Sequence, residues 1–327
     1  MPVAGSSLDA GGAVPQTDSL PNLARSGDRC WRPSAAPVRV VSGKPQTIPW
    51  WLWWNVLSAD APTVALVWAA LFAHATGGKL AATDATVLVL AVWVVYVSDR
   101  LLDGWTAKNL ATLQERHRFC DRHRFALFGL VVVASATMVW LIANRLPTEE
   151  VGAGAKLGII LMLYMAAIHA GSRHVARLLP KEIVVGFLFA SGVILPVWSQ
   201  SVRFRWDLFL PWSLLALLCS LNCLSIEFWE NDGRGSIEMR PSFVREAAAH
   251  INGIAAALAT SALLACLVSA RGAPSVSGLL AVCVGALLIL VLHRSRSRLS
   301  PAALRVLADA ALVVPPLIAV GIRGSMA

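Results

Sequence analysis

The sequence predicts an all-α polytopic membrane protein, with about nine transmembrane helices bundled around a central cavity. Hydrophobic residues make up 57% of the 327 residues and charged residues only 14%. Soluble domains are about 45–50% apolar and about 25% charged. The second observation is that long apolar runs follow one another with short breaks from Pro49 onward. Composition and pattern together exclude an ordinary soluble protein and a disordered one.

Each apolar run approaches the roughly 20 residues that a helix needs to cross a bilayer. Prolines in or beside the runs are compatible with this assignment, because membrane helices tolerate them. Little sequence is left between the runs, so we expect no folded soluble domain. The predicted spans are 59–75, 84–102, 125–143, 156–171, 183–200, 207–227, 247–270, 276–293 and 303–322.

The chain divides once, near Pro49. Residues 1–48 are rich in Ser, Gly, Pro and Ala and have no apolar period, which predicts a disordered tail. No apolar run follows a basic start there, so no secretory signal peptide is expected. Residues 49–327 form the predicted membrane domain. Its first residues place four Trp within 50–54, which predicts an interfacial anchor or simply the start of the first span.

The net charge of +9 is sorted by the predicted topology. With nine spans, 19 Lys and Arg fall in the N-terminal tail and the loops on its side, against seven on the other side. Loops rich in Lys and Arg stay in the cytoplasm. We therefore expect a multi-pass protein of the cell (inner or plasma) membrane with a cytoplasmic N-terminus. The excess charge marks one membrane face and is not a sign of nucleic-acid binding.

Two acidic clusters lie at the cytoplasmic ends of spans. Asp99 and Asp103 close the second span and share one helix face, since they are four residues apart. Two such carboxylates can hold Mg²⁺ together with waters and substrate phosphates. They are equally compatible with two solvated acids, one of them paired with Arg100.

The second cluster closes the sixth span with the same design. Glu227 and Glu230 share a face, Asn222 adds a neutral oxygen, and Asp232 follows in the loop. Facing clusters of this kind would bind Mg²⁺ through Asp99, Asp103 and these four residues, and with nearby cations would hold a diphosphate. Arg is suited to bidentate phosphate contact. The candidate cations are Arg100, Arg116, Arg173, Arg177 and Lys181. The positive-inside rule alone would also place Lys and Arg in these loops.

On these residues the chain resembles the UbiA-type intramembrane prenyltransferase superfamily. That family has nine helices and aspartate-rich motifs at the ends of helices 2 and 6. Asp99 and Asp103 match the last two acids of its first motif, N-D-x-x-D-x-x-x-D, and Val95 and Tyr96 replace the first two positions. Glu227, Glu230 and Asp232 occupy the second region with different spacing, and the segment from Arg173 to Lys181 is similar to its basic segment after helix 4.

The resemblance implies an Mg²⁺-dependent prenyltransferase that moves an isoprenyl group from a prenyl diphosphate to an aromatic or lipid acceptor. Lewis-acid neutralisation would make diphosphate a better leaving group, and the apolar tail would lie between spans, away from water. The acids would be the catalytic and metal-binding residues, and Arg173, Arg177 and Lys181 would hold the diphosphate. Membrane lipid is the expected surrounding.

Two other readings stay open. A non-catalytic membrane protein or transporter could keep the fold without the ligands, as the replacements at Val95 and Tyr96 allow. A CDP-alcohol phosphotransferase-like enzyme would use the motif D-x-x-D-G-x-x-A-R. The chain comes near this motif with Asp99, Asp103, Gly104, Ala107 and Lys108, but the gap between the two Asp is one residue too long. The metal hypothesis requires that Asp99 and Asp103 face Glu227 and Glu230 across a shared cavity.

Overall fold

The computed structural model describes residues 49–106, 115–169, 180–200, 205–231, 242–269 and 275–324. These residues are helical nearly throughout, and no strand occurs among them. The predicted N-terminal tail, 1–48, lies outside the described residues. The described part therefore confirms an all-α protein.

Nine helices coincide with the nine predicted spans. Eight of them are long and apolar enough to cross a membrane, and the ninth, α2, qualifies only together with the short helices before it. The protein is thus a multi-pass membrane protein of roughly nine helices. The nine are α2 (Asp60–Ala75), α3 (Ala82–Thr106), α5 (Arg124–Arg145), α6 (Thr148–His169), α8 (Lys181–Gln200), α9 (Arg205–Asn231), α11 (Ile251–Val268), α12 (Ser275–Arg294) and α13 (Pro301–Gly324).

The inner helix is α2, which packs against α3, α8, α12 and α13. Its 16 residues rise about 24 Å, short of the roughly 30 Å hydrocarbon core. Trp68, Leu71 and Phe72 are fully buried in the largest hydrophobic cluster. The Trp68 indole Nε1 donates to the carbonyl oxygen of Leu312 at 2.8 Å, so a buried polar atom is satisfied and α2 is tied to α13.

The Trp-rich segment forms two short helices of its own, η1 (Trp50–Leu52) and α1 (Trp53–Val56). They are bent 79° from α2 at a break over residues 57–59. Ser58 at the break has a φ of 57°, a left-handed conformation that is uncommon for a residue with a Cβ. The Trp run is therefore not a straight continuation of the first span, because its short helices are bent away from α2.

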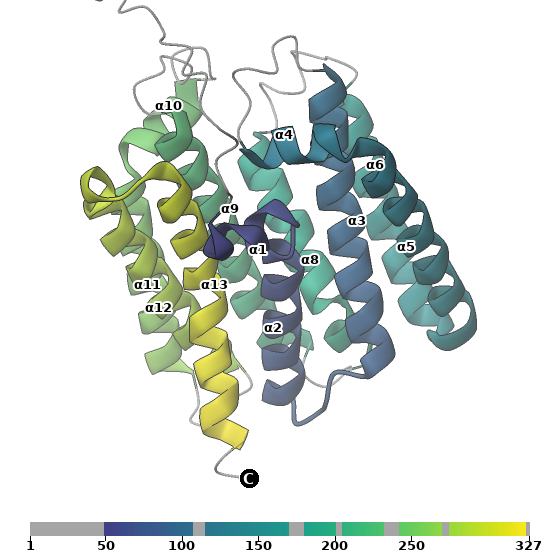
Figure 1. Ribbon diagram of the computed structural model, residues 1–327. Coiled ribbons are helices and arrows are strands. Elements are labelled where there is room, and N and C mark those ends of the chain that lie inside the picture. The colour runs from purple at the N-terminus through teal and green to yellow at the C-terminus, as the bar shows by residue number, and fades with distance from the viewer. Residues whose placement is uncertain are drawn as a thin grey trace, which may run out of the picture. The chain divides into compact units, whose positions relative to one another are not determined.

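The periphery consists of α5 and α6, whose spans are only 6% buried. Large apolar side chains such as Phe125, Val133, Met162 and Leu163 are exposed on them, as expected of surfaces facing lipid. Two short helices, α4 (Glu115–Arg122) and α10 (Ser242–Ala249), lie at one end of the bundle, where α12 also passes into α13 through η4 (Arg296–Arg298) (Figure 1). We call this the basic end, because predicted Lys- and Arg-rich loops, including η4, belong to it.

Candidate functional site

A polar site lies near the basic end, where α8 packs against α3 and α6. The Lys181 ammonium, on the first residue of α8, forms a salt bridge of 3.3 Å with the Asp99 carboxylate on α3. The two side chains are 43% and 25% exposed, so both remain accessible. Lys181 also interacts electrostatically with Asp103, one turn further along α3. The structure thus brings together one predicted diphosphate-binding cation and both acids of the first predicted cluster.

Two further polar residues of this site, Tyr164 and Glu182, were not indicated by the sequence. Tyr164, five residues before the end of α6, is 7% exposed, and its hydroxyl has no hydrogen-bond partner among the described residues. It interacts electrostatically with Glu182 and Asp99. A polar atom buried at this depth is an informative signal, since most buried hydroxyls are satisfied. We call Asp99, Asp103, Tyr164, Lys181 and Glu182 the α3–α8 site.

Arg100, predicted to hold diphosphate, has a different surrounding. Its guanidinium is buried and donates to the carbonyl oxygen of Asn55 at 2.8 Å and to Ser58 Oγ at 2.6 Å. It also lies 3.7 Å from the Asp60 carboxylate. These contacts satisfy backbone and side-chain groups at the break between α1 and α2. In this arrangement Arg100 supports the broken helix and does not face the α3–α8 site.

Glu230, predicted as a metal ligand, forms a buried ion pair with Arg305 of α13. Beside it, Trp229 Nε1 donates to His293 Nδ1 of α12 at 3.1 Å. These contacts join α9, α12 and α13 at the basic end. Arg305 is one of two Arg that fell inside predicted spans, and an intramembrane cation usually has a nearby acidic partner. The pairing of Glu230 explains why Arg305 is tolerated there.

Asn222, also predicted as a metal ligand, belongs to a second polar cluster deeper in the bundle. Its amide nitrogen donates to Asp309 Oδ1 at 3.3 Å, and the Asn55 amide nitrogen donates to Asp309 Oδ2 at 2.9 Å and to Asp60 Oδ2 at 3.0 Å. All four side chains are buried. We call Asn55, Asp60, Asn222 and Asp309 the inner polar cluster. Acids inside predicted spans would have indicated it, because such residues are functional candidates by default.

The remaining predicted residues divide between the described and the undescribed chain. Glu227 is partly buried on α9 and interacts electrostatically with Cys223. The backbone of Arg116 belongs to α4, but its side chain lies outside the described set, as do Arg173, Arg177 and Asp232. Among the described residues, no three His, Cys, Asp or Glu side chains gather so that they could hold a metal ion. The cavity beside Asn222 and Asp309 is lined by none of Asp99, Asp103, Glu227 and Glu230, so it is not the shared cavity that the two-cluster metal hypothesis requires.

Mg²⁺, which the resemblance implies, needs less than such a group. It is commonly held by one or two carboxylates together with waters and substrate phosphates. Asp99 and Asp103, one turn apart and partly exposed, meet that smaller requirement. The second cluster, with Glu230 in an ion pair and Asn222 in the inner polar cluster, fits it less well.

Comparison of the chain with protein-family models, with curated proteins and with solved structures gives no match. The function is therefore argued from the chain's own sites.

Proposed function

We propose that the protein is an integral membrane prenyltransferase, which transfers an isoprenyl group from a prenyl diphosphate to an aromatic or lipid acceptor. The observation that carries the proposal is the contact of Lys181 with Asp99 at the basic end. It brings a candidate phosphate-binding cation to a candidate metal-binding acid on two helices that are distant in sequence. The nine apolar helices of the described part would provide apolar surroundings for the prenyl chain.

In this proposal the α3–α8 site holds the diphosphate. Asp99 and Asp103 would hold Mg²⁺, which neutralises diphosphate as a leaving group when bound. Lys181 would donate a charge-assisted hydrogen bond to a phosphate oxygen, and the Tyr164 hydroxyl on α6 would be a second donor. Binding requires the Lys181 ammonium to exchange part of its contact with Asp99 for the phosphate. The apolar helices keep water from the allylic carbon.

The test is turnover by the purified full-length protein. With Mg²⁺, a radiolabelled prenyl diphosphate and membrane lipid extract, the protein should consume the diphosphate and label a lipid-soluble product. Asp103→Ala should abolish turnover. Asp121→Ala is the matched control, because Asp121 is an acid of the neighbouring α4 that pairs with Arg124. Equal turnover by wild type and Asp103→Ala would refute the assignment.

A second candidate function is cation-coupled transport, and one observation favours it. The bent α1–α2 pair and the inner polar cluster resemble the discontinuous helices and mid-membrane polar residues of transporters. Proteoliposomes that contain the full chain distinguish the two functions. A transporter would move an ion or solute without consuming prenyl diphosphate, whereas the proposed enzyme would consume it without a gradient.

A further inference from the structure

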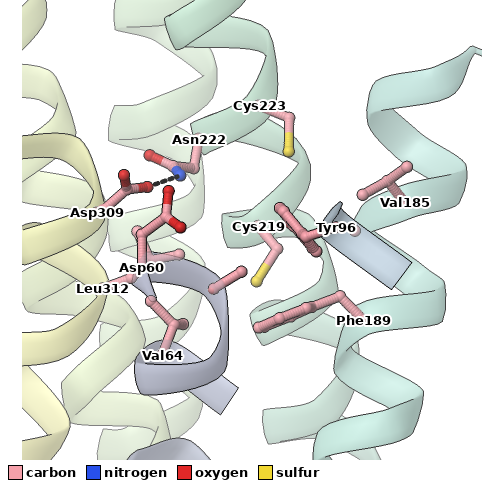
Figure 2. Close-up of a pocket in the computed structure, with 12 residues that line it drawn as sticks. Asp60, Val64, Tyr96, Val185, Phe189, Cys219, Asn222, Cys223, Asp309 and Leu312 are labelled. Atoms are coloured by element: carbon pink, nitrogen blue, oxygen red, sulfur yellow. Dashed lines mark hydrogen bonds between the residues drawn. The ribbon is translucent and has the colours of Figure 1, made fainter. Parts of the chain in front are cut away.

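A small cavity adjoins the inner polar cluster. Its volume is about 40 Å³, which is room for roughly three water molecules. Residues of α2, α3, α8, α9 and α13 line it. Figure 2 shows Asp60, Asn222 and Asp309 on one side, with Tyr96, Cys219 and Phe189 opposite. The cavity is therefore polar on one wall and largely apolar on the other.

This cavity lies at membrane depth. Asp309 is eight residues into α13 and Asn222 is nine residues from the end of α9. At 1.5 Å per residue, both lie about 12 Å inside the bundle from the basic end. Water is scarce at this depth, so an ionised carboxylate is costly unless a positive charge compensates it.

Asp309 has only neutral partners. Its two carboxylate oxygens accept from the amides of Asn222 and Asn55, and it forms no ion pair within the described part of the chain. Asp309 is only 8% exposed. Two amide hydrogen bonds orient the carboxylate but leave its negative charge uncompensated.

The surrounding charges are already engaged with other groups. On the side of α2 and α3, Arg100 lies against Asp60. On α13, Arg305 is one turn before Asp309 and acts on it electrostatically, but its ion pair is with Glu230 of α9. The other titratable groups that face Asp309 are Tyr96, Cys219 and Cys223, which are uncharged in their ordinary forms. The wall supplied by α8 is apolar.

Two oxygen atoms complete the arrangement. The amide oxygens Oδ1 of Asn222 and Asn55 have no hydrogen-bond partner in the described residues. Asn222 is 7% exposed and Asn55 is 1% exposed. Asn222 itself lines the cavity beside Asp309. A buried carbonyl oxygen without a donor costs free energy, and together with carboxylate oxygens it is a ligand that hard cations prefer.

We propose that this cavity binds one monovalent cation, a proton or an ion of the size of Na⁺, on the Asp309 carboxylate and the Asn222 amide oxygen. One positive charge would compensate the Asp309 carboxylate, which forms no ion pair among the described residues and lies beside the unsatisfied Asn222 amide oxygen. Arg100 beside Asp60 makes a divalent ion unfavourable. The inference does not depend on the proposed prenyl transfer, because it concerns residues outside the α3–α8 site.

The test measures the stability of the purified full-length protein in detergent without any diphosphate. Ligands that bind only the folded state raise the midpoint of thermal unfolding. If Na⁺ is the ligand, replacing choline chloride by NaCl at constant ionic strength should raise the midpoint by about 5 °C at saturation. If a proton is the ligand, NaCl has no effect, and infrared difference spectra should show the carbonyl stretch of a buried protonated carboxyl group.

Asp309→Asn should remove either response, since it keeps the shape and loses the charge. Asp84→Asn is the matched control, because Asp84 is an equally buried aspartate that accepts from the neutral amide of Gln200 at 2.8 Å. It should retain the wild-type response. If Asp309→Asn does not fold, Asn222→Leu serves instead. It should raise the half-saturating Na⁺ concentration about tenfold if Na⁺ is the ligand. If a proton is the ligand, it should change the proton concentration at the midpoint of the infrared titration about tenfold.

The proposal is overturned if wild type and Asp309→Asn respond identically. It is also overturned if wild type shows neither a Na⁺ effect nor a protonated carboxyl band.

Discussion

Gly186 on α8 lies against α9 and has the least room for a Cβ among the described glycines. A Cβ placed there would lie 2.2 Å from Ser220 Oγ, 2.7 Å from the carbonyl oxygen of Ala216 and 2.7 Å from the Ser220 backbone nitrogen. Small residues let membrane helices pack at this distance. Two of the three atoms belong to the backbone of α9, so they cannot rotate away. Gly186→Ala must therefore push α8 from α9.

The cost follows from this geometry. Overpacking a well-packed core typically costs 1–3 kcal/mol, and a clash with a helix backbone belongs at the upper end, about 3 kcal/mol. For a chain of this size that corresponds to a decrease of about 5 °C or more in the unfolding midpoint. The assay is thermal unfolding of the purified protein in one detergent, followed by tryptophan fluorescence and by loss of the monodisperse size-exclusion peak.

The same helix provides the matched control. Gly192→Ala would meet only Leu157 Cδ2, at 3.9 Å, an ordinary contact. Its midpoint should equal or slightly exceed that of wild type, since Ala favours helix more than Gly. Adding Ser220→Ala to Gly186→Ala should not restore stability, because the backbone contacts persist. Full rescue by Ser220→Ala, or equal midpoints for the two glycine variants, would refute the reasoning.

Three further predictions concern charged side chains. Arg100→Met should lower the free energy of unfolding by about 3 kcal/mol, since it removes a buried ionic partner of Asp60; equal denaturant midpoints for variant and wild type would contradict this. Glu230→Gln should destabilise similarly by leaving the Arg305 charge with a neutral partner, and Glu230→Gln/Arg305→Met should recover part of the loss in a double-mutant cycle. Strict additivity would argue against the pair. Lys181→Met should weaken prenyl diphosphate binding about tenfold or more, as measured by titration calorimetry, while Arg124→Met should not; an unchanged affinity would remove Lys181 from the site.

The sequence predicted the fold well because its main signal is physical and local. A span of about 20 apolar residues has few structural alternatives in lipid. Each of the nine runs became a helix, and the largest difference is at α6, which begins at Thr148 where the prediction began at residue 156. The exception is the beginning of the chain's membrane part. Nothing in the run from Trp50 to Trp54 indicated the 79° bend, at which Arg100 of α3 contacts Asn55 and Ser58.

The candidate site was predicted less completely, for a related reason. Helix periodicity places Asp99 with Asp103 and Glu227 with Glu230, but it does not say which helix faces which. Packing placed Lys181 against Asp99 and paired Glu230 with Arg305 of α13. Asn222 likewise faces Asp309, 87 residues away in sequence. Such pairings depend on the rotation of each helix, which loop composition and span length do not determine.

The central claim is that the α3–α8 site binds a prenyl diphosphate together with Mg²⁺. The most direct measurement is titration calorimetry of the full-length protein with a non-hydrolysable prenyl phosphonate analogue, with Mg²⁺ and with excess chelator. The account predicts saturable binding that requires Mg²⁺, is lost in Asp99→Asn/Asp103→Asn and is retained in the Asp121→Asn control. Absence of binding by wild type, or equal Mg²⁺-dependent binding by the double variant, would contradict it.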